Sequence, residues 1–189
     1  MAGLKIVGIS GSLRAGSFNT WALQNCASLM SSGMTLHMAS IQDLPLYNPD
    51  LHANGFPKSV QTLRDEMASA DGIILASPEY NWTIGAPLKN AIDWISRFPE
   101  GQQAFAQKPC AIISATPGPL GGARGQYDLR RSIGGLGALV LSKPEIFINH
   151  CKTKFDTNGK ITDEPTLKIM KEQMTAFEDW IVRMKKAFQ

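Results

Sequence analysis

The sequence lacks any cluster of cysteines or histidines that could build a metal centre or a disulfide framework. Its three cysteines, Cys26, Cys110 and Cys151, are far apart and form no CxxC pair, and its three histidines stand at no ligand spacing. An odd number of isolated cysteines is typical of reduced thiols in an intracellular protein. No bound metal is expected.

Long apolar runs and a strong charge of one sign are also missing. No stretch approaches the roughly 20 apolar residues of a membrane span, and the N-terminal segment has no charged leader or cleavage site, so we expect a soluble cytoplasmic protein. The net charge is only +3. Its one basic cluster, Arg183, Lys185 and Lys186, is typical of a solvated helix end, so no nucleic-acid partner is expected.

Three familiar motifs are absent. The sequence contains no GxxxxGK[ST], which excludes a nucleoside-triphosphate P-loop. It contains no GxGxxG, and the end of the predicted strand 34–39, which reads MAS, lacks the acidic residue that would hold a ribose, which disfavours a tightly bound dinucleotide. At Gly8 to Ser12 the sequence reads GxSxS, where a serine hydrolase elbow would read GxSxG, so acyl transfer is disfavoured too.

What the sequence does contain is an alternation of short apolar runs with segments of helical period. The predicted strands are 4–9, 34–39, 72–77, 110–115, and a fifth over 138–141 and 145–148, interrupted near Pro144. The predicted helices are 18–30, 59–70, 87–98, 122–133 and 167–188, and FDTNGKIT is typical of a small hairpin. This alternation predicts a single α/β domain over 1–189, a flavodoxin-like three-layer sandwich whose five-stranded parallel sheet has the order 2-1-3-4-5.

In that order the first, third and fourth strands are neighbours, and ligands bind beyond their carboxyl ends. The first of the three loops there reads SGSLRAGSFN. Hydroxyl and amide groups of Ser10, Ser12, Ser17 and Asn19 can donate hydrogen bonds, Arg14 can fork onto an oxyanion, and the following helix directs free N–H groups at the same point. An ordinary N-cap needs fewer donors, so the loop predicts a site for a terminal phosphate.

The second and third loops indicate a flat ring beside that phosphate. Residues 78–82, PEYNW, combine a rigid backbone with two aromatics that can wall a heterocycle, although exposed aromatics serve subunit contacts equally well. Glu79, as an exposed carboxylate, is predicted to be a loop residue rather than a proton donor, and no catalytic acid or nucleophile is predicted. Thr116 to Arg124 is rich in Gly and Pro, which permits close approach to a planar ligand. A phosphate site beside a flat-ring site suggests flavin mononucleotide, FMN.

The motifs GSLRAGSFN and PEYNWTIGAPLKNAIDW together resemble the NAD(P)H-dependent FMN reductases, most closely their bacterial chromate and quinone reductase branch. DLPLY (43–47), GGARGQYDLR (121–130) and KPE (143–145) extend the resemblance over nearly the whole chain. It implies an enzyme with tightly bound FMN that passes hydride from NAD(P)H through flavin N5 to quinone, azo, chromate or free flavin acceptors. The implied FMN-binding residues are Ser12, Arg14, Ser17, Phe18 and Asn19 at the phosphate, Pro78, Glu79, Tyr80 and Asn81 at the isoalloxazine ring, and Thr116 beside the flavin.

The sequence departs from that family at one point and leaves other readings open. Gly85-Ala86, followed by Pro87, stands where relatives commonly have Pro-Gly, which affects the pocket edge and the acceptor preference. The resemblance also implies a homodimer or homotetramer, in which Arg124, Tyr127 and Glu145 match a polar group between subunits; an ordinary surface network is the alternative. A flavodoxin-like electron carrier and a phosphate-binding module remain open as functions.

Overall fold

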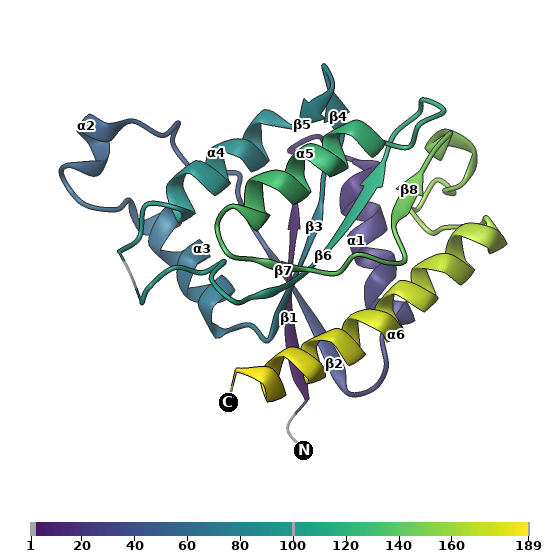
Figure 1. Ribbon diagram of the computed structural model, residues 1–189. Helices are drawn as coiled ribbons and strands as arrows, with labels where there is room; N and C mark the ends of the chain where they lie inside the picture. Colours follow the sequence, from purple (N-terminus) through teal and green to yellow (C-terminus); the bar gives the residue numbers. More distant parts are fainter. Residues whose placement is uncertain (1–2, 100, 189) are drawn as a thin grey trace.

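The computed structural model describes residues 3–99 and 101–188 as a parallel sheet between two layers of helices (Figure 1). The sheet strands are β1 Leu4–Ser10, β2 Met34–Ala39, β3 Gly72–Ala76, β6 Pro109–Ala115, β7 Leu139–Val140 and β8 Ile146–Ile148. Their order is β2-β1-β3-β6-β7, with β8 also paired to β6, and every pair is parallel. The predicted order 2-1-3-4-5 is confirmed.

The fifth place in the sheet is shared by two short strands. β7 pairs with Pro109 and Cys110 at the start of β6, whereas β8 pairs with Ile113 to Ala115 at its end. The interruption predicted near Pro144 therefore divides one strand into two, and the sheet has six strands where five were predicted.

Helices cover both faces of the sheet. Their bounds are α1 Phe18–Leu29, α2 Pro49–His52, α3 Lys58–Ser69, α4 Ala86–Ile95, α5 Ala123–Gly134 and α6 Glu164–Ala187, with a 3-10 turn at Cys151–Thr153. One hydrophobic core lies between the sheet and α3, α4 and α5, and a second lies between the sheet and α1 and α6. The sequence did not predict α2 or the small antiparallel hairpin of β4 (Glu79–Tyr80) and β5 (Thr83–Ile84).

The last helix shows how the sequence pattern produces one of these layers. Met170, Phe177 and Ile181 recur at helical spacing and are fully buried against the sheet. Asp163 caps the helix by accepting a hydrogen bond from the Thr166 N–H. Just before it, an antiparallel bridge between Phe155 and Ile161 confirms the small hairpin predicted from the Asn-Gly turn.

The three cysteines lie unpaired in these cores. Burial raises the pKa of Cys26 and of Cys110 to about 12, and that of Cys151 to about 11, so all three are neutral thiols near pH 7. Over residues 3–99 and 101–188 we find no helix with the length and apolar character to span a membrane. The same residues contain no group of three or more His, Cys, Asp or Glu arranged to hold a metal ion.

Candidate functional site

The loops that follow β1, β3 and β6 pack against one another at the carboxyl edge of the sheet. The Gly11 N–H donates to the Ala76 carbonyl at 2.7 Å, and the Ser77 N–H donates to the Ile113 carbonyl at 3.1 Å. A Cβ atom at Gly85 would lie 2.7 Å from the Gly11 carbonyl oxygen. Glycine at position 85 therefore lets the second loop rest directly on the first.

The first loop leaves the N-terminus of α1 open to an anion. Ser17 is the N-cap, and its Oγ accepts a hydrogen bond from the Thr20 N–H; the first turn of α1 holds no acidic residue. The other N–H groups of a first helical turn have no carbonyl partner within the helix. By contrast, α6 starts with Asp163 and Glu164. The partial positive charge of the α1 dipole is thus unopposed by its own side chains.

The polar side chains of this loop surround that helix end. The Ser12 hydroxyl accepts from the Arg14 N–H at 3.4 Å, and Ser10 Oγ shares a hydrogen bond of 2.8 Å with Thr20 Oγ1. Arg14 is exposed, with its guanidinium carbon 5.7 Å from the centre of the Phe18 ring. Its charged group is therefore free to fold over an anion at the helix N-terminus.

Asn19 does not take part in the way the sequence suggested. Its side chain is buried, donates from Nδ2 to the Ala115 carbonyl at 3.0 Å, and accepts at Oδ1 from the Ala115 N–H, also at 3.0 Å. Both the nitrogen and the oxygen of the amide are thus engaged in tying α1 to the end of β6. The backbone N–H of Asn19, in the first turn of α1, is the group that faces the open helix end.

Glu79 is not the exposed loop carboxylate that the sequence predicted. Its side chain is 13% exposed; Oε2 accepts from the Gly125 N–H at 3.1 Å, and Oε1 lies 3.5 Å from an Arg124 nitrogen. Gly125 is in the first turn of α5. The carboxylate therefore supplies an anion to the N-terminus of α5 from within the chain.

The hairpin that carries Glu79 is fixed to α5 at a second point. Thr83 Oγ1 donates a hydrogen bond to Asp128. This bond and a further one from Arg131 hold the pKa of Asp128 below its usual value. A Cβ atom at Gly125 would lie 3.0 Å from the Thr83 carbonyl oxygen, so the two segments are in close contact. Hairpin and helix end form one unit.

The turn of this hairpin exposes two aromatic rings. Asn81 and Trp82 adopt positive φ angles of 50° and 70°. Tyr80 is 55% exposed and Trp82 is 71% exposed. The guanidinium carbon of Arg124 lies 3.8 Å from the centre of the Trp82 ring, a cation–π stack that was not predicted, because the two residues are distant in the chain.

The third loop borders an open pocket of about 360 Å³ beside this unit. It is lined by Glu79, Thr116, Pro117, Gly118, Pro119, Leu120, Gly122 and Arg124. The loop's glycines do not all serve a ligand: Cβ atoms at Gly121 and Gly122 would lie within 2.8 Å of Phe147 and Ser114, so packing requires these two glycines. A Cβ atom at Gly118 would meet nothing within 4 Å, so of these three glycines Gly118 alone faces open space.

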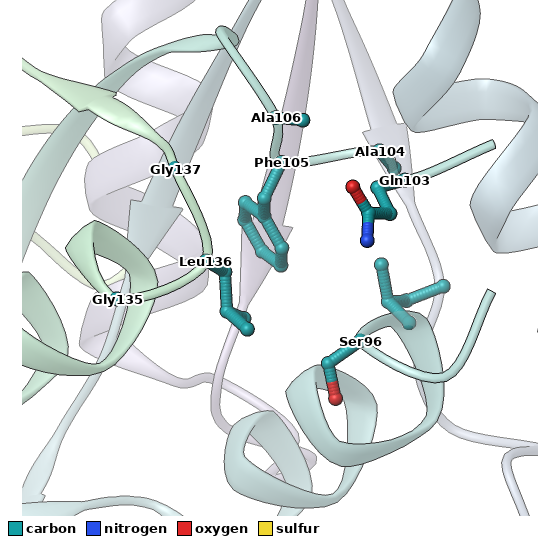
Figure 2. A pocket seen from close by; sticks show the side chains of 9 residues that line it. Ser96, Gln103, Ala104, Phe105, Ala106, Gly135, Leu136 and Gly137 are labelled. Carbon is teal, nitrogen blue, oxygen red and sulfur yellow. The ribbon is translucent and has the colours of Figure 1, made fainter. Parts of the chain in front are cut away.

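A second cavity of about 340 Å³ lies elsewhere, beside the C-terminal ends of α4 and α5. Figure 2 shows Phe105 and Leu136 among its side chains, with Ser96 and Gln103 as its polar groups. It contains none of the predicted site residues and no charged side chain. The two cavities are similar in volume, and their chemistry distinguishes them.

Of Arg124, Tyr127 and Glu145, the last two interact within the chain, whereas Arg124 is bound elsewhere. Glu145 is paired with Lys143 at 2.5 Å. Burial acts to raise the pKa of Glu145, but hydrogen bonds from Lys143 and Tyr127 outweigh it and leave that pKa below its usual value. Arg124 instead pairs with Glu79, and the Tyr127 side chain is 55% exposed.

An open helix N-terminus next to a cavity at this edge of a doubly wound parallel sheet defines a flavodoxin-like protein with a site for a phosphate-bearing planar cofactor. The chain belongs to the NADPH-dependent FMN reductase family, whose sequence model matches residues 4–153. It is an oxidoreductase of the kind that uses FMN with NAD(P)H as the electron donor.

Individual proteins show how far this similarity extends. An NAD(P)H-dependent FMN reductase of Pseudomonas aeruginosa is 42% identical over 182 residues, which cover 96% of this chain and 97% of that protein. A quinone reductase of Escherichia coli is 40% identical over 185 residues, covering 96% and 97%. The solved structure of FerB, a flavoenzyme NAD(P)H:(acceptor) oxidoreductase from Paracoccus denitrificans, superposes with a TM-score of 0.87 at 35% identity and covers 96% of this chain and 98% of its own.

Proposed function

We propose that the chain, as one FMN-binding domain over 1–189, transfers hydride from NAD(P)H to quinones and related acceptors. The observation that carries this proposal is the open N-terminus of α1 beside a cavity that shares the same sheet edge. NAD(P)H and a quinone, with one proton, give NAD(P)⁺ and a hydroquinone. The relatives named as quinone reductases support quinone as an acceptor.

The residues present fit FMN. The α1 end, without an acidic residue in its first turn, would hold the phosphate through Ser12, Arg14 and Ser17 and the backbone N–H groups of Phe18 and Asn19. Pro78, Glu79, Tyr80, Asn81 and Thr116 are proposed to border the isoalloxazine ring, Glu79 through its backbone because its carboxylate is bound to α5. When bound, FMN supplies hydride acceptance and release at N5.

The protein's own part is binding and exclusion of water. The loops position the planar groups, and no side chain is assigned to donate or accept a proton. We propose that NAD(P)H and the acceptor use the same opening in turn, as a two-step, ping-pong exchange, with azo compounds, chromate and free flavin as further acceptors. NAD(P)H is available in the cytoplasm, which favours that location.

An assembly of two or four copies is part of the proposal. Tyr127, on the exposed side of α5, and Leu120, 47% exposed in the third loop, offer an apolar face near the cavity. A homodimer or homotetramer that used this face would bring Arg124, Tyr127 and Glu145 near a second copy.

Steady-state kinetics test the function. With FMN-loaded protein, varying NADPH at several fixed concentrations of a naphthoquinone should give parallel double-reciprocal lines, as a two-step exchange requires. Intersecting lines would replace that exchange by simultaneous binding of both substrates. Protein that binds FMN but turns over no quinone with NADPH or NADH would instead be an electron carrier.

A further inference from the structure

We propose that Gln126, acting through Ser114, orients the peptide between Gly121 and Gly122 so that its N–H faces the isoalloxazine ring. Gln126 is thus a positioning residue, because it contacts Ser114 and not the ring. The inference rests on the proposed function, since it assumes that the third loop borders a bound flavin.

The side-chain amide of Gln126 has only one orientation that satisfies its partners. Its Oε1 accepts a hydrogen bond from Arg130 at 3.2 Å, and its Nε2 donates to the Ile146 carbonyl at 2.9 Å. A guanidinium only donates and a carbonyl only accepts, so exchanging the amide nitrogen and oxygen would lose both hydrogen bonds. Gln126 is 1% exposed, and water therefore has no access to replace them.

This orientation fixes the hydroxyl of Ser114 in turn. The second hydrogen of Gln126 Nε2 is donated to Ser114 Oγ at 3.1 Å. That hydroxyl has one hydrogen of its own, and its oxygen lies 2.6 Å from the Gly121 carbonyl oxygen and 3.5 Å from that of Ile146. The shorter contact takes the hydrogen, since Gln126 already donates to Ile146. A chain of hydrogen bonds thus runs from Arg130 in α5 to the third loop.

The peptide that Ser114 holds joins two glycines. Gly121 and Gly122 have positive φ angles of 61° and 87°, and two successive glycines resist a reversal of the peptide between them only weakly. With the Gly121 carbonyl bound to Ser114, the N–H of Gly122 points the opposite way, because the two groups of a trans peptide are antiparallel. Close contacts explain why both residues are glycine, and the hydrogen bond from Ser114 fixes which way their peptide faces.

The N–H of Gly122 is available to a ligand. Within residues 3–99 and 101–188 it donates to no other group of the chain. Gly122 lines the open pocket of about 360 Å³ together with Thr116, which is proposed to border the ring. The edge of an isoalloxazine carries oxygen and nitrogen atoms that accept hydrogen bonds, which suits a free backbone N–H. A reversed peptide would present a carbonyl oxygen to the same edge and repel it.

Gln173 offers a matched comparison outside the site. It is also 1% exposed, and its Nε2 donates to the carbonyls of Ile112 at 3.2 Å and Pro144 at 2.9 Å. Its hydrogen bonds thus tie α6 to the sheet and reach no residue of the third loop. A loss of buried hydrogen bonds alone should affect Gln126 and Gln173 variants alike.

Flavin binding by Gln126→Met and Gln173→Met is the first test. Both changes keep an unbranched side chain and remove the amide, so we expect urea denaturation midpoints to fall by similar amounts. Only Gln126→Met should weaken riboflavin binding, by about fivefold, the value of one hydrogen bond. Riboflavin has the ring without the phosphate, so its affinity reports the third loop and not the end of α1.

Ser114→Ala tests the peptide while Gln126 stays in place. It removes one hydroxyl and keeps the Cβ atom on which Gly122 packs. Hydrogen exchange followed by NMR should show that FMN slows exchange of the Gly122 N–H by about tenfold in the unaltered protein, and that Ser114→Ala loses most of this protection.

Two results would overturn the inference and leave the proposed function standing. One is exchange at Gly122 that FMN does not slow; the other is riboflavin affinity that is unchanged in Gln126→Met and Ser114→Ala. Quinone turnover by the unaltered protein would still support the proposed function in either case. An unaltered protein that binds no flavin would overturn both.

Discussion

Two helices begin at the same edge of the sheet, and the chain treats their N-termini in opposite ways. The end of α1 carries serine hydroxyls and Arg14 and has no acidic residue in its first turn. The end of α5 also has no acidic residue in its first turn, yet the carboxylate of Glu79, from a distant hairpin, accepts a hydrogen bond from the Gly125 N–H there. One end is left for an anion from outside, and the other is already satisfied by the chain.

The two regions also differ in where their backbone strain lies. The first loop has glycine, Gly16, at its positive φ of 66°. The hairpin on α5 places Asn81 and Trp82 at positive φ instead. A loop that binds a phosphate needs only a backbone that turns, whereas the hairpin keeps a large aromatic, Trp82, at a positive φ that favours glycine. We infer that the first region holds the phosphate of the cofactor and that the second borders its ring, where substrates meet it.

The largest effect is expected from reversing the charge of Arg14 at the open N-terminus of α1. Arg14→Glu removes a charge-assisted contact and places a carboxylate beside the phosphate, so we expect FMN affinity to fall by several hundredfold, about 3.5 kcal/mol. Arg14 is exposed, so the denaturation midpoint of the FMN-free protein should be unchanged.

Flavin fluorescence titration measures the affinity, and urea denaturation of the FMN-free protein measures stability. Arg183→Glu makes the same charge change at an exposed position of α6. It is the control and should bind FMN with the affinity of the unaltered protein. FMN binding by Arg14→Glu with the affinity of the unaltered protein would show that α1 is not the phosphate site.

Asn19 tests whether the first region is only a binding loop. Asn19→Ala removes both hydrogen bonds to Ala115 and leaves a buried carbonyl and N–H without partners, so we expect a loss of about 2 to 3 kcal/mol in the free energy of unfolding. Ser12→Ala is the opposite case: its hydroxyl has one long contact within the chain, and it should weaken FMN binding without altering stability. Equal stability of the two variants would contradict this division.

Whether a feature of the fold or of the site could be predicted from the sequence depends on how far apart in the chain its interacting residues are. The sheet order and the three loops followed from apolar periodicity and turn residues, which are properties of short segments. Ser17 as the N-cap of α1 is likewise local, because its partner Thr20 is three positions away. These features could be predicted and are present.

The errors arose where partners are distant in the chain. Asn19 and Ala115 are 96 positions apart, and Glu79 and Gly125 are 46 apart. In the sequence both polar residues stand in loops rich in donors, so each appeared free for a ligand. Only the packing of β6 and α5 against these loops shows that the two side chains are already bound. Gly121 and Gly122 appeared ligand-related for the same reason, although contacts with Phe147 and Ser114 require them.

The smallest expected effect is the difference in stability between glycine and alanine variants of the hairpin, and its sign should differ between Trp82 and Tyr80. Trp82→Gly and Trp82→Ala both remove the indole and its stack on Arg124, so the difference between them reports the backbone alone. At a φ of 70° glycine is unstrained, and we expect Trp82→Gly to be the more stable by about 1 kcal/mol. Tyr80 lies in β4, where alanine is favoured over glycine. The free energy of unfolding of Tyr80→Ala should therefore exceed that of Tyr80→Gly by about 0.5 to 1 kcal/mol.

Denaturation midpoints of the four variants measure both differences. If Trp82→Gly is no more stable than Trp82→Ala, the turn is unstrained and its conformation says nothing about how substrates meet the ring. If it is the more stable but also loses kcat/KM with quinones, then the chain keeps tryptophan at a position where glycine fits the backbone better because acceptors use the indole. At position 82, glycine would then favour stability and tryptophan would favour acceptor turnover. At Gly16 in the first loop there is no such conflict, because the residue at positive φ is already glycine.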